Sequence, residues 1–232
     1  MVPGGVAGSE GGTAGAGRPP DGYGGYRTRL VETLRARGVR DLAVLKAFAE
    51  TPRHLFVPEG VRHRAYEDSA LPLGAGQTVS QPFTQARSLE ALRLTGREKV
   101  LEVGTGSGYQ TALLAAIVDQ VFSVERLRPL AEAAQRALRE AGVKNVSLLV
   151  GDGTLGWSAY APYDAIVVAA GGPEVPPPLL AQLAAGGRLL IPLGDRGGQH
   201  LTLVERFGGE LRRRALGEAH FVPLVGGHGF RA

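Results

Sequence analysis

Three glycines at positions 104, 106 and 108 directly follow an apolar run at Lys99–Val103. Glycine has no Cβ atom, so a loop of this composition can turn sharply and let its backbone approach a bound ligand. In open parallel sheets, ligands bind at the carboxyl ends of the strands, where such a loop begins. The sixth position is Tyr109, where the dinucleotide fingerprint has Gly or Ala. We therefore predict a ligand-binding loop at Gly104, Thr105, Gly106 and Gly108.

Three acidic side chains accompany this loop, and each could accept hydrogen bonds from a different part of one cofactor. Glu125 lies 21 residues after the first glycine, at the end of the next apolar run, where a carboxylate can bind both ribose hydroxyls. Glu102 is a charge inside an apolar strand that needs a partner, and we expect it beside an ammonium group. Asp152, between Gly151 and Gly153, could accept from the exocyclic amine of adenine. Together these groups describe S-adenosylmethionine better than NAD.

The elements that must position these residues alternate between apolar strands and helices. Strands separated by helices of about 10 to 15 residues are typical of an α/β fold with a doubly wound, mostly parallel sheet. Two helices precede this pattern, and Asp41 is expected to cap the second, with Leu42, Leu45 and Phe48 on one face. We expect strands at 99–103, 120–124, 146–150, 164–169 and 188–192, with antiparallel additions at 201–205 and 219–224. We expect helices from 26 to a stop at 38, then at 42–50, 83–94, 109–118, 128–141 and 178–185.

Composition divides the chain into three parts. Residues 1–25 contain ten glycines and three prolines and almost no large apolar side chain, which predicts a disordered tail. Residues 26–95 form a helical and substrate-loop region. It contains an irregular, proline-punctuated stretch at 51–81, and connections of that length are usually functional. Residues 96–232 form the cofactor-binding α/β core.

The composition also excludes several classes of protein. The chain has no cysteine, which excludes disulfides and thiolate zinc sites and favours a cytoplasmic location. No run of about 18 apolar residues could cross a membrane, and no signal peptide is expected. The net charge is +4, but the basic residues are scattered apart from Arg212–Arg214. The five histidines lie far apart without ligand spacing, so we expect no metal.

Segments upstream of the glycine loop carry a more specific signal. They are Thr51–Val57, Ala65–Asp68 and Gly76–Pro82, joined by the closing Phe221–Leu224. With the glycine loop and its acids, over about residues 26–226, they resemble the protein-L-isoaspartate (D-aspartate) O-methyltransferase family of class I S-adenosylmethionine-dependent methyltransferases. The resemblance implies a Rossmann-like sheet of seven strands, S-adenosylmethionine as cofactor and S-adenosylhomocysteine as product. It also implies methyl transfer to the α-carboxylate of L-isoaspartyl and D-aspartyl residues in damaged proteins, which initiates their repair.

The resemblance also implies the site residues. The serine regarded as the active-site residue falls on Ser80, and Thr78 and Val79 fall in the same substrate loop. Gln77 and Gln85, with Thr78 and Ser80, fall at positions expected to contact the cofactor. No general base is required, because a carboxylic acid ordinarily ionises at about pH 4 and is therefore already a carboxylate at neutral pH. A hydroxyl such as that of Ser80 can hold it by a charge-assisted hydrogen bond.

Two other functions are consistent with parts of the sequence. The fold and the positive charge permit an RNA methyltransferase acting on tRNA. However, residues 171–174 (Gly-Gly-Pro-Glu) stand where adenine-amino methylases carry an Asn/Asp-Pro-Pro-aromatic motif. A non-catalytic cofactor-binding or partner-binding domain is the second alternative, and the intact loop at 76–82 argues against it. We expect isoaspartyl proteins or peptides as partners, a monomer, and neither a membrane nor a nucleic acid.

Overall fold

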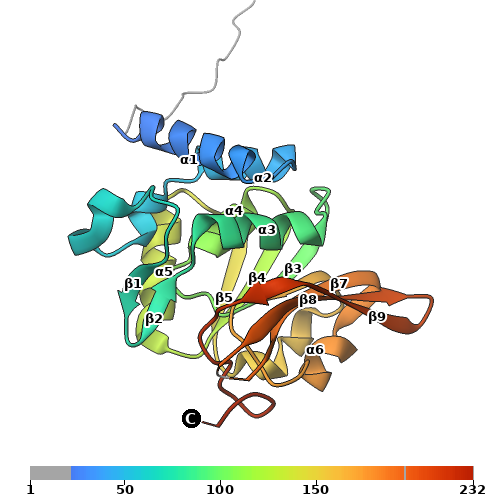
Figure 1. Ribbon diagram of the computed structural model, residues 1–232. Coiled ribbons are helices and arrows are strands. Elements are labelled where there is room, and N and C mark those ends of the chain that lie inside the picture. Colours follow the sequence, from blue (N-terminus) through green and yellow to red (C-terminus); the bar gives the residue numbers. More distant parts are fainter. Residues whose placement is uncertain (1–21, 196, 232) are drawn as a thin grey trace, which may run out of the picture.

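The computed structural model describes residues 22–195 and 197–231, and its centre is a seven-stranded sheet (Figure 1). The strand order is β5-β4-β3-β6-β7-β8-β9; β3 to β7 are parallel, and β8 and β9 are antiparallel additions. This confirms the doubly wound, mostly parallel sheet. The strands are β3 Lys99–Val103, β4 Gln120–Glu125, β5 Val146–Val150, β6 Tyr163–Val168, β7 Leu183–Gly194, β8 Gln199–Phe207 and β9 Glu210–Ala219.

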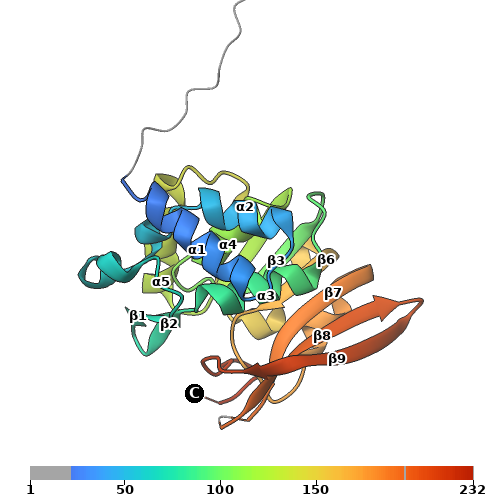
Figure 2. The ribbon, with the colours of Figure 1, turned by 45° about the horizontal axis from the view of Figure 1, so that its top comes forward.

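Helices cover both faces of the sheet. Helices α1 to α5 lie on one face and α6 lies on the other (Figure 1). In the view of Figure 2, strands β7 to β9 extend the sheet beyond the helices α1 to α4. The helices are α1 Gly24–Ala36, α2 Leu42–Glu50, α3 Pro82–Leu92, α4 Tyr109–Ala115, α5 Arg128–Glu140 and α6 Pro177–Ala181.

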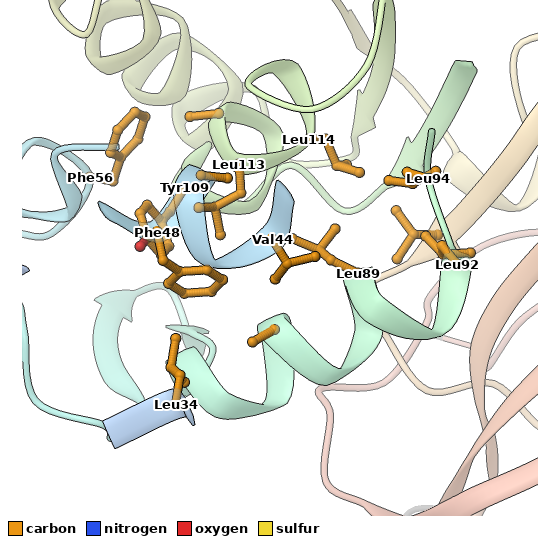
Figure 3. Packing of buried hydrophobic residues seen from close by; sticks show 14 of the residues in the cluster. Leu34, Val44, Phe48, Phe56, Leu89, Leu92, Leu94, Tyr109, Leu113 and Leu114 are labelled. Atoms are coloured by element: carbon orange, nitrogen blue, oxygen red, sulfur yellow. The ribbon is translucent and has the colours of Figure 1, made fainter. Parts of the chain in front are cut away.

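The larger hydrophobic cluster joins the N-terminal helices to the sheet. Side chains from α1 to α4 meet in it, as Figure 3 shows for Leu34, Phe48, Leu89 and Leu113. Asp41 caps α2 as expected, because its side chain accepts hydrogen bonds from two backbone N–H groups in the first turn. The prediction for Leu42 was wrong, because this side chain is 75% exposed. The buried face of α2 is formed by Val44, Leu45, Ala47 and Phe48.

The proline-punctuated stretch is more ordered than its composition indicated. Two short 3-10 turns, Arg53–Phe56 and Glu59–Arg64, precede an antiparallel hairpin of β1 Leu71–Gly74 and β2 Gln77–Val79. At the hairpin tip Ala75 adopts a φ of 51°, between two glycines that also have positive φ. We did not predict these strands, because three or four residues are too few to show a period. The hairpin leads directly into α3.

Two C-terminal elements differ from the prediction. The second antiparallel strand is not at 219–224 but at Glu210–Ala219, where a turn at Gly208–Gly209 with positive φ at both residues returns the chain beside β8. Most β9 side chains are exposed on both faces, so the strand has no apolar alternation to detect. Helix α6 ends at Ala181 because the next residues pair with Tyr163 of β6 and enter β7.

Candidate active site

A cavity opens at the carboxyl ends of β3, β4 and β6. The strand order reverses between β3 and β6, and open α/β sheets bind ligands at such a switch point. The space that is not filled by atoms, including the open solvent at the mouth, is about 850 Å³. Its wall includes the β1–β2 hairpin and Ser80, the glycine loop after β3, the ends of β4 and β6, and residues 222–225 near the C-terminus.

The glycine loop takes conformations that require glycine. Gly104 has a φ of 94° and Gly108 a φ of 84°, both in the left-handed region that disfavours other residues. A Cβ atom on Gly108 would also lie 3.2 Å from the Cβ of Ala134 in α5. The glycines therefore allow the loop to bend between β3 and α4 while packing against α5. Gly104, Thr105 and Gly106 line the cavity, whereas Gly108 does not.

Glu125 is fixed at the end of β4 by the loops on either side. Its Oε2 accepts a hydrogen bond from Gly106 N–H at 2.9 Å, and its Oε1 accepts from Leu127 N–H at 2.9 Å. The residue is only 7% exposed but lines the cavity. Each carboxylate oxygen has further acceptor capacity, so the side chain can bind a pair of hydroxyl groups without moving.

Asp152 lies beside the cavity and holds the C-terminal segment. It accepts from the N–H and the hydroxyl of Thr154 at 2.9 and 2.7 Å, and from Gly227 N–H at 2.7 Å. Burial opposes its ionisation, but these hydrogen bonds outweigh burial and lower the pKa of the carboxyl. Gly153 lines the cavity, whereas Gly151 and Asp152 do not.

Glu102 lies one layer behind the cavity wall. Its carboxylate is 0% exposed and accepts hydrogen bonds from Ser123 at 2.7 Å, from Gln110 at 3.2 Å and from Thr111. Burial raises the pKa of Glu102 to about 7, against the effect of these donors. The Ser123 hydroxyl is also hydrogen-bonded to the Thr105 hydroxyl, so the buried acid stabilises the glycine loop through Ser123.

Gln110, which sequence reasoning missed, connects Glu102 to the cavity. Its Nε2 donates to the Glu102 carboxylate, so its Oε1 is left as an acceptor, and the residue lines the cavity. Only its position in the first turn after the glycine loop could have indicated that Gln110 lies at the site. The segment Val222–Val225 was also missed, because long-range contacts bring it to the site. Ala169 and Ala170, which directly follow β6, line the cavity as well.

The substrate loop predicted from the resemblance lies at the same cavity as the glycine loop. Gln77, Thr78, Val79, Ser80 and Gln85 all line the cavity. Asp68 fixes the start of α3 behind this loop, accepting from Phe83 N–H at 2.9 Å and from the side chain of Gln81.

Within residues 22–195 and 197–231, no three His, Cys, Asp or Glu side chains are grouped so that they could hold a metal ion. None of the helices in this described part is long and apolar enough to span a bilayer.

The sheet and its site define the class of protein. A seven-stranded sheet with two antiparallel strands at one edge, a glycine loop after its first strand and an acid after its second is the architecture of class I S-adenosylmethionine-dependent methyltransferases.

The sequence family of protein-L-isoaspartate (D-aspartate) O-methyltransferase matches residues 26–229. The chain therefore belongs to this family.

Individual relatives agree with this assignment. The protein-L-isoaspartate O-methyltransferase of Syntrophus aciditrophicus (strain SB) is 51% identical over 208 residues, which cover 88% of this chain and 95% of that protein. The protein-L-isoaspartate O-methyltransferase of Dictyoglomus thermophilum is 47% identical over 205 residues, which cover 88% of this chain and 93% of that protein. A solved protein-L-isoaspartate O-methyltransferase superposes with a TM-score of 0.81 at 32% identity, covering 88% of this chain and 67% of that one. A Plasmodium falciparum structure in complex with S-adenosyl-L-homocysteine shares the fold, with a TM-score of 0.76 at 24% identity. The match covers 86% of this chain and 98% of that one.

Proposed function

We propose that this protein transfers the methyl group of S-adenosylmethionine to the α-carboxylate of L-isoaspartyl residues, and of D-aspartyl residues, in damaged proteins or peptides. The observation that supports this most directly is the single cavity lined by both Ser80 and the glycine loop. The family's substrate loop and its cofactor loop therefore both contribute to the wall of one cavity.

The residues of the cavity suit S-adenosylmethionine. Glu125 would accept hydrogen bonds from the ribose hydroxyls, since both of its oxygens are already oriented by backbone N–H groups. Gln110 would present Oε1 to the ammonium group, and Glu102 would act behind it. Gly104, Thr105 and Gly106, with Gln77, Thr78 and Gln85, would bound the cofactor, and Gly153 would lie at the adenine end beside Asp152.

The substrate loop would position the carboxylate. The bound cofactor supplies an electrophilic methyl group, and the isoaspartyl carboxylate is already ionised at neutral pH, so the protein need not remove a proton. Ser80 would donate its O–H to one carboxylate oxygen, and Thr78 and Val79 would hold the peptide around it. The task of these residues is then to bring two reacting atoms within about 3 Å in line, which can contribute a large part of the rate enhancement.

A labelling experiment tests this function. The protein is incubated with methyl-labelled S-adenosylmethionine and, separately, an isoaspartyl peptide, the same peptide with a normal aspartyl residue, and tRNA. We expect label in the isoaspartyl peptide alone, released by mild base as a methyl ester would be. Base-stable label in tRNA would favour RNA methylation instead, and binding of the cofactor with no label transferred would indicate a non-catalytic domain.

The oligomeric state and the location belong to the same proposal. A monomer is sufficient, because one chain contributes every wall of the cavity described above. The lack of cysteine supports a reducing compartment such as the cytoplasm. Light scattering at catalytic concentrations would test the first statement, and fractionation of the source cells the second.

A further inference from the structure

A fully buried arginine lies directly beneath the substrate loop. Arg53 begins the 3-10 turn Arg53–Phe56 and is 0% exposed. Its Nη2 donates to the carbonyl oxygens of Ser80 at 3.1 Å and Ser69 at 3.4 Å, and its Nη1 donates to Gln85 Oε1 at 3.2 Å. The guanidinium therefore binds both ends of the segment that contains the hairpin. Two of its partners, Ser80 and Gln85, also line the cavity.

All of these partners are neutral. Arg53 forms no ion pair with any residue in the described parts of the chain. Its Cζ lies 4.8 Å from the centroid of the buried Tyr109 ring, and its Nε is buried without a hydrogen-bond partner in the described structure. Asp68 acts on it only from beyond ion-pair distance and is itself paired with Arg37.

Such a cation is unfavourable for folding unless an anion approaches it. Burial lowers the pKa of Arg53, yet a guanidinium stays protonated in proteins. Apart from its neutral acceptors, only Tyr109, Tyr66 and the more distant Asp68 favour the charged form. A buried charge without a close anion is expensive to maintain. The cavity beside it belongs to an enzyme whose proposed substrate is a carboxylate, so the substrate itself is the anion that would compensate the charge.

We infer that Arg53 is a positioning residue, which supplies the fixed positive charge that selects an ionised carboxylate at Ser80. The inference rests on the proposed function and adds how the site distinguishes the carboxylate from neutral groups. Arg53 does not line the cavity, so it acts through the Ser80 backbone and through its electric field. Between groups shielded from water such a field is screened far less than between exposed charges.

Binding of two peptides that differ only in charge tests the inference. One carries an isoaspartyl residue, and the other carries the α-carboxamide in place of the α-carboxylate. Their affinities are measured by fluorescence anisotropy in the presence of saturating S-adenosylhomocysteine. We expect the wild type to bind the carboxylate at least tenfold more tightly than the carboxamide. We expect Arg53→Met to reduce this ratio to about threefold or less, and Arg53→Lys, which keeps the positive charge, to retain most of it.

A matched control removes the same charge elsewhere. Arg188 is largely buried, donates to Arg93 O at 2.7 Å and lies 3.8 Å from Glu98, away from the cavity. Arg188→Met should leave the carboxylate-to-carboxamide ratio unchanged. A purely structural Arg53 would weaken both peptides equally in Arg53→Met and keep the ratio, which would overturn the inference.

A second measurement uses the wild type alone and does not depend on how the variants fold. The ratio is measured from 0.05 to 1 M NaCl. Because a buried charge is little screened, the preference for the carboxylate should fall less than threefold over this range. If the preference disappears in high salt, exposed arginines cause it and the inference is wrong. Methylation of the isoaspartyl peptide by the wild type reports separately on the proposed function; if that fails, the inference falls with it.

Discussion

At the scale of single residues, the two acids near the glycine loop have opposite environments. Glu125 lies at the edge of the cavity and is held by two backbone N–H groups. Glu102 is enclosed and is held by side-chain donors only. The positions of both acids in their strands could be predicted from the sequence. Their burial relative to the cavity could not, because it depends on the residues that pack around each side chain. The sequence therefore located Glu102 correctly in its strand but not relative to the cavity.

The buried acid should make stability depend on pH. The pKa of Glu102 is raised by burial to about 7 in the folded protein, and it lies near 4.3 in an unfolded chain. The folded state then binds more protons than the unfolded state between these values, so the contribution of Glu102 is present at low pH and is lost as pH rises to about 7. Its loss is on the order of 3 kcal/mol.

Urea unfolding of the wild type and of Glu102→Gln at pH 5, 6, 7 and 8 measures this effect. Glutamine keeps the shape of the side chain but does not ionise. The free energy of unfolding of the variant should therefore rise relative to that of the wild type as pH increases. A difference between the two proteins that stays constant over these pH values would show that Glu102 does not titrate in this range.

Substitution of Ser80 should affect turnover more than cofactor binding. Ser80→Ala removes the proposed charge-assisted hydrogen bond, a loss of about 1.5 to 3 kcal/mol, which corresponds to roughly a 10- to 150-fold lower kcat. The affinity for S-adenosylhomocysteine should change little, because Glu125 and the glycine loop are intact. Ser147→Ala, on the exposed side of β5, is a control that should leave kcat unchanged.

The pH profile of kcat separates a base-free reaction from a base-catalysed one. No base takes part in the proposed mechanism, so kcat at saturating cofactor and peptide should be nearly constant from pH 6 to 8. A steep rise near pH 7 that one histidine substitution abolishes would contradict the mechanism. A rise that Glu102→Gln abolishes would instead identify the buried acid as its source.

At the scale of elements, local signals were predictable and long-range ones were not. The glycine loop and Asp41 at the start of α2 were identified because each depends on neighbours within a few residues. The role of residues 222–225 depends on Gly171, which accepts from Leu224 N–H at 2.7 Å and donates to Val222 O at 2.8 Å. No period in the sequence encodes such a pairing between distant segments, so this wall of the cavity was missed.

The C-terminal segment should contribute to cofactor affinity. Truncation after Val225 removes the Gly227 N–H bond to Asp152, the His228 N–H bond to Thr154 and the Phe230 N–H bond to Leu224 O. Loss of about 1 kcal/mol of net hydrogen bonding would weaken S-adenosylhomocysteine binding roughly fivefold. Titration calorimetry of the truncated and full-length proteins with S-adenosylhomocysteine measures this change in affinity.

The matched variant for this truncation is His228→Ala. It keeps the backbone bonds, since His228 donates through its N–H group, and it should bind like the wild type. If the truncated protein also binds like the wild type, residues beyond 225 do not support the site.

At the scale of the whole molecule, the core is divided between the two faces of the sheet. One cluster includes α1 to α4 and the sheet residues Val100 and Val121, and the other includes Leu101 and Phe122 on the opposite face. Alternation within β3 and β4 thus places successive side chains in different clusters. This could be predicted in outline, because strands buried on both faces are continuously apolar. What could not be predicted is that β9 pairs with the sheet without burying a face of its own.

The N-terminal region allows a sharp test of where the folded molecule begins. The expected tail includes residues 1–21, which lie outside the described residues, whereas Gly24 and Gly25, expected in the same tail, form the first turn of α1. Deleting 1–21 should change the melting temperature by no more than about 2 °C, since the segment has almost no large apolar side chain to bury. Scanning calorimetry of both proteins measures the difference.

A longer truncation gives this prediction its control. Deleting residues 1–37 also removes α1, whose Leu30 and Leu34 are 2% and 0% exposed in the larger cluster. Removing a buried leucine side chain alone costs about 2 to 5 kcal/mol, so the loss of two with their helix should consume most of the stability of an ordinary domain. The longer truncation should therefore melt at least 10 °C lower or fail to fold. If instead the two truncations lose stability together, residues 1–21 stabilise the fold through contacts that their composition does not indicate.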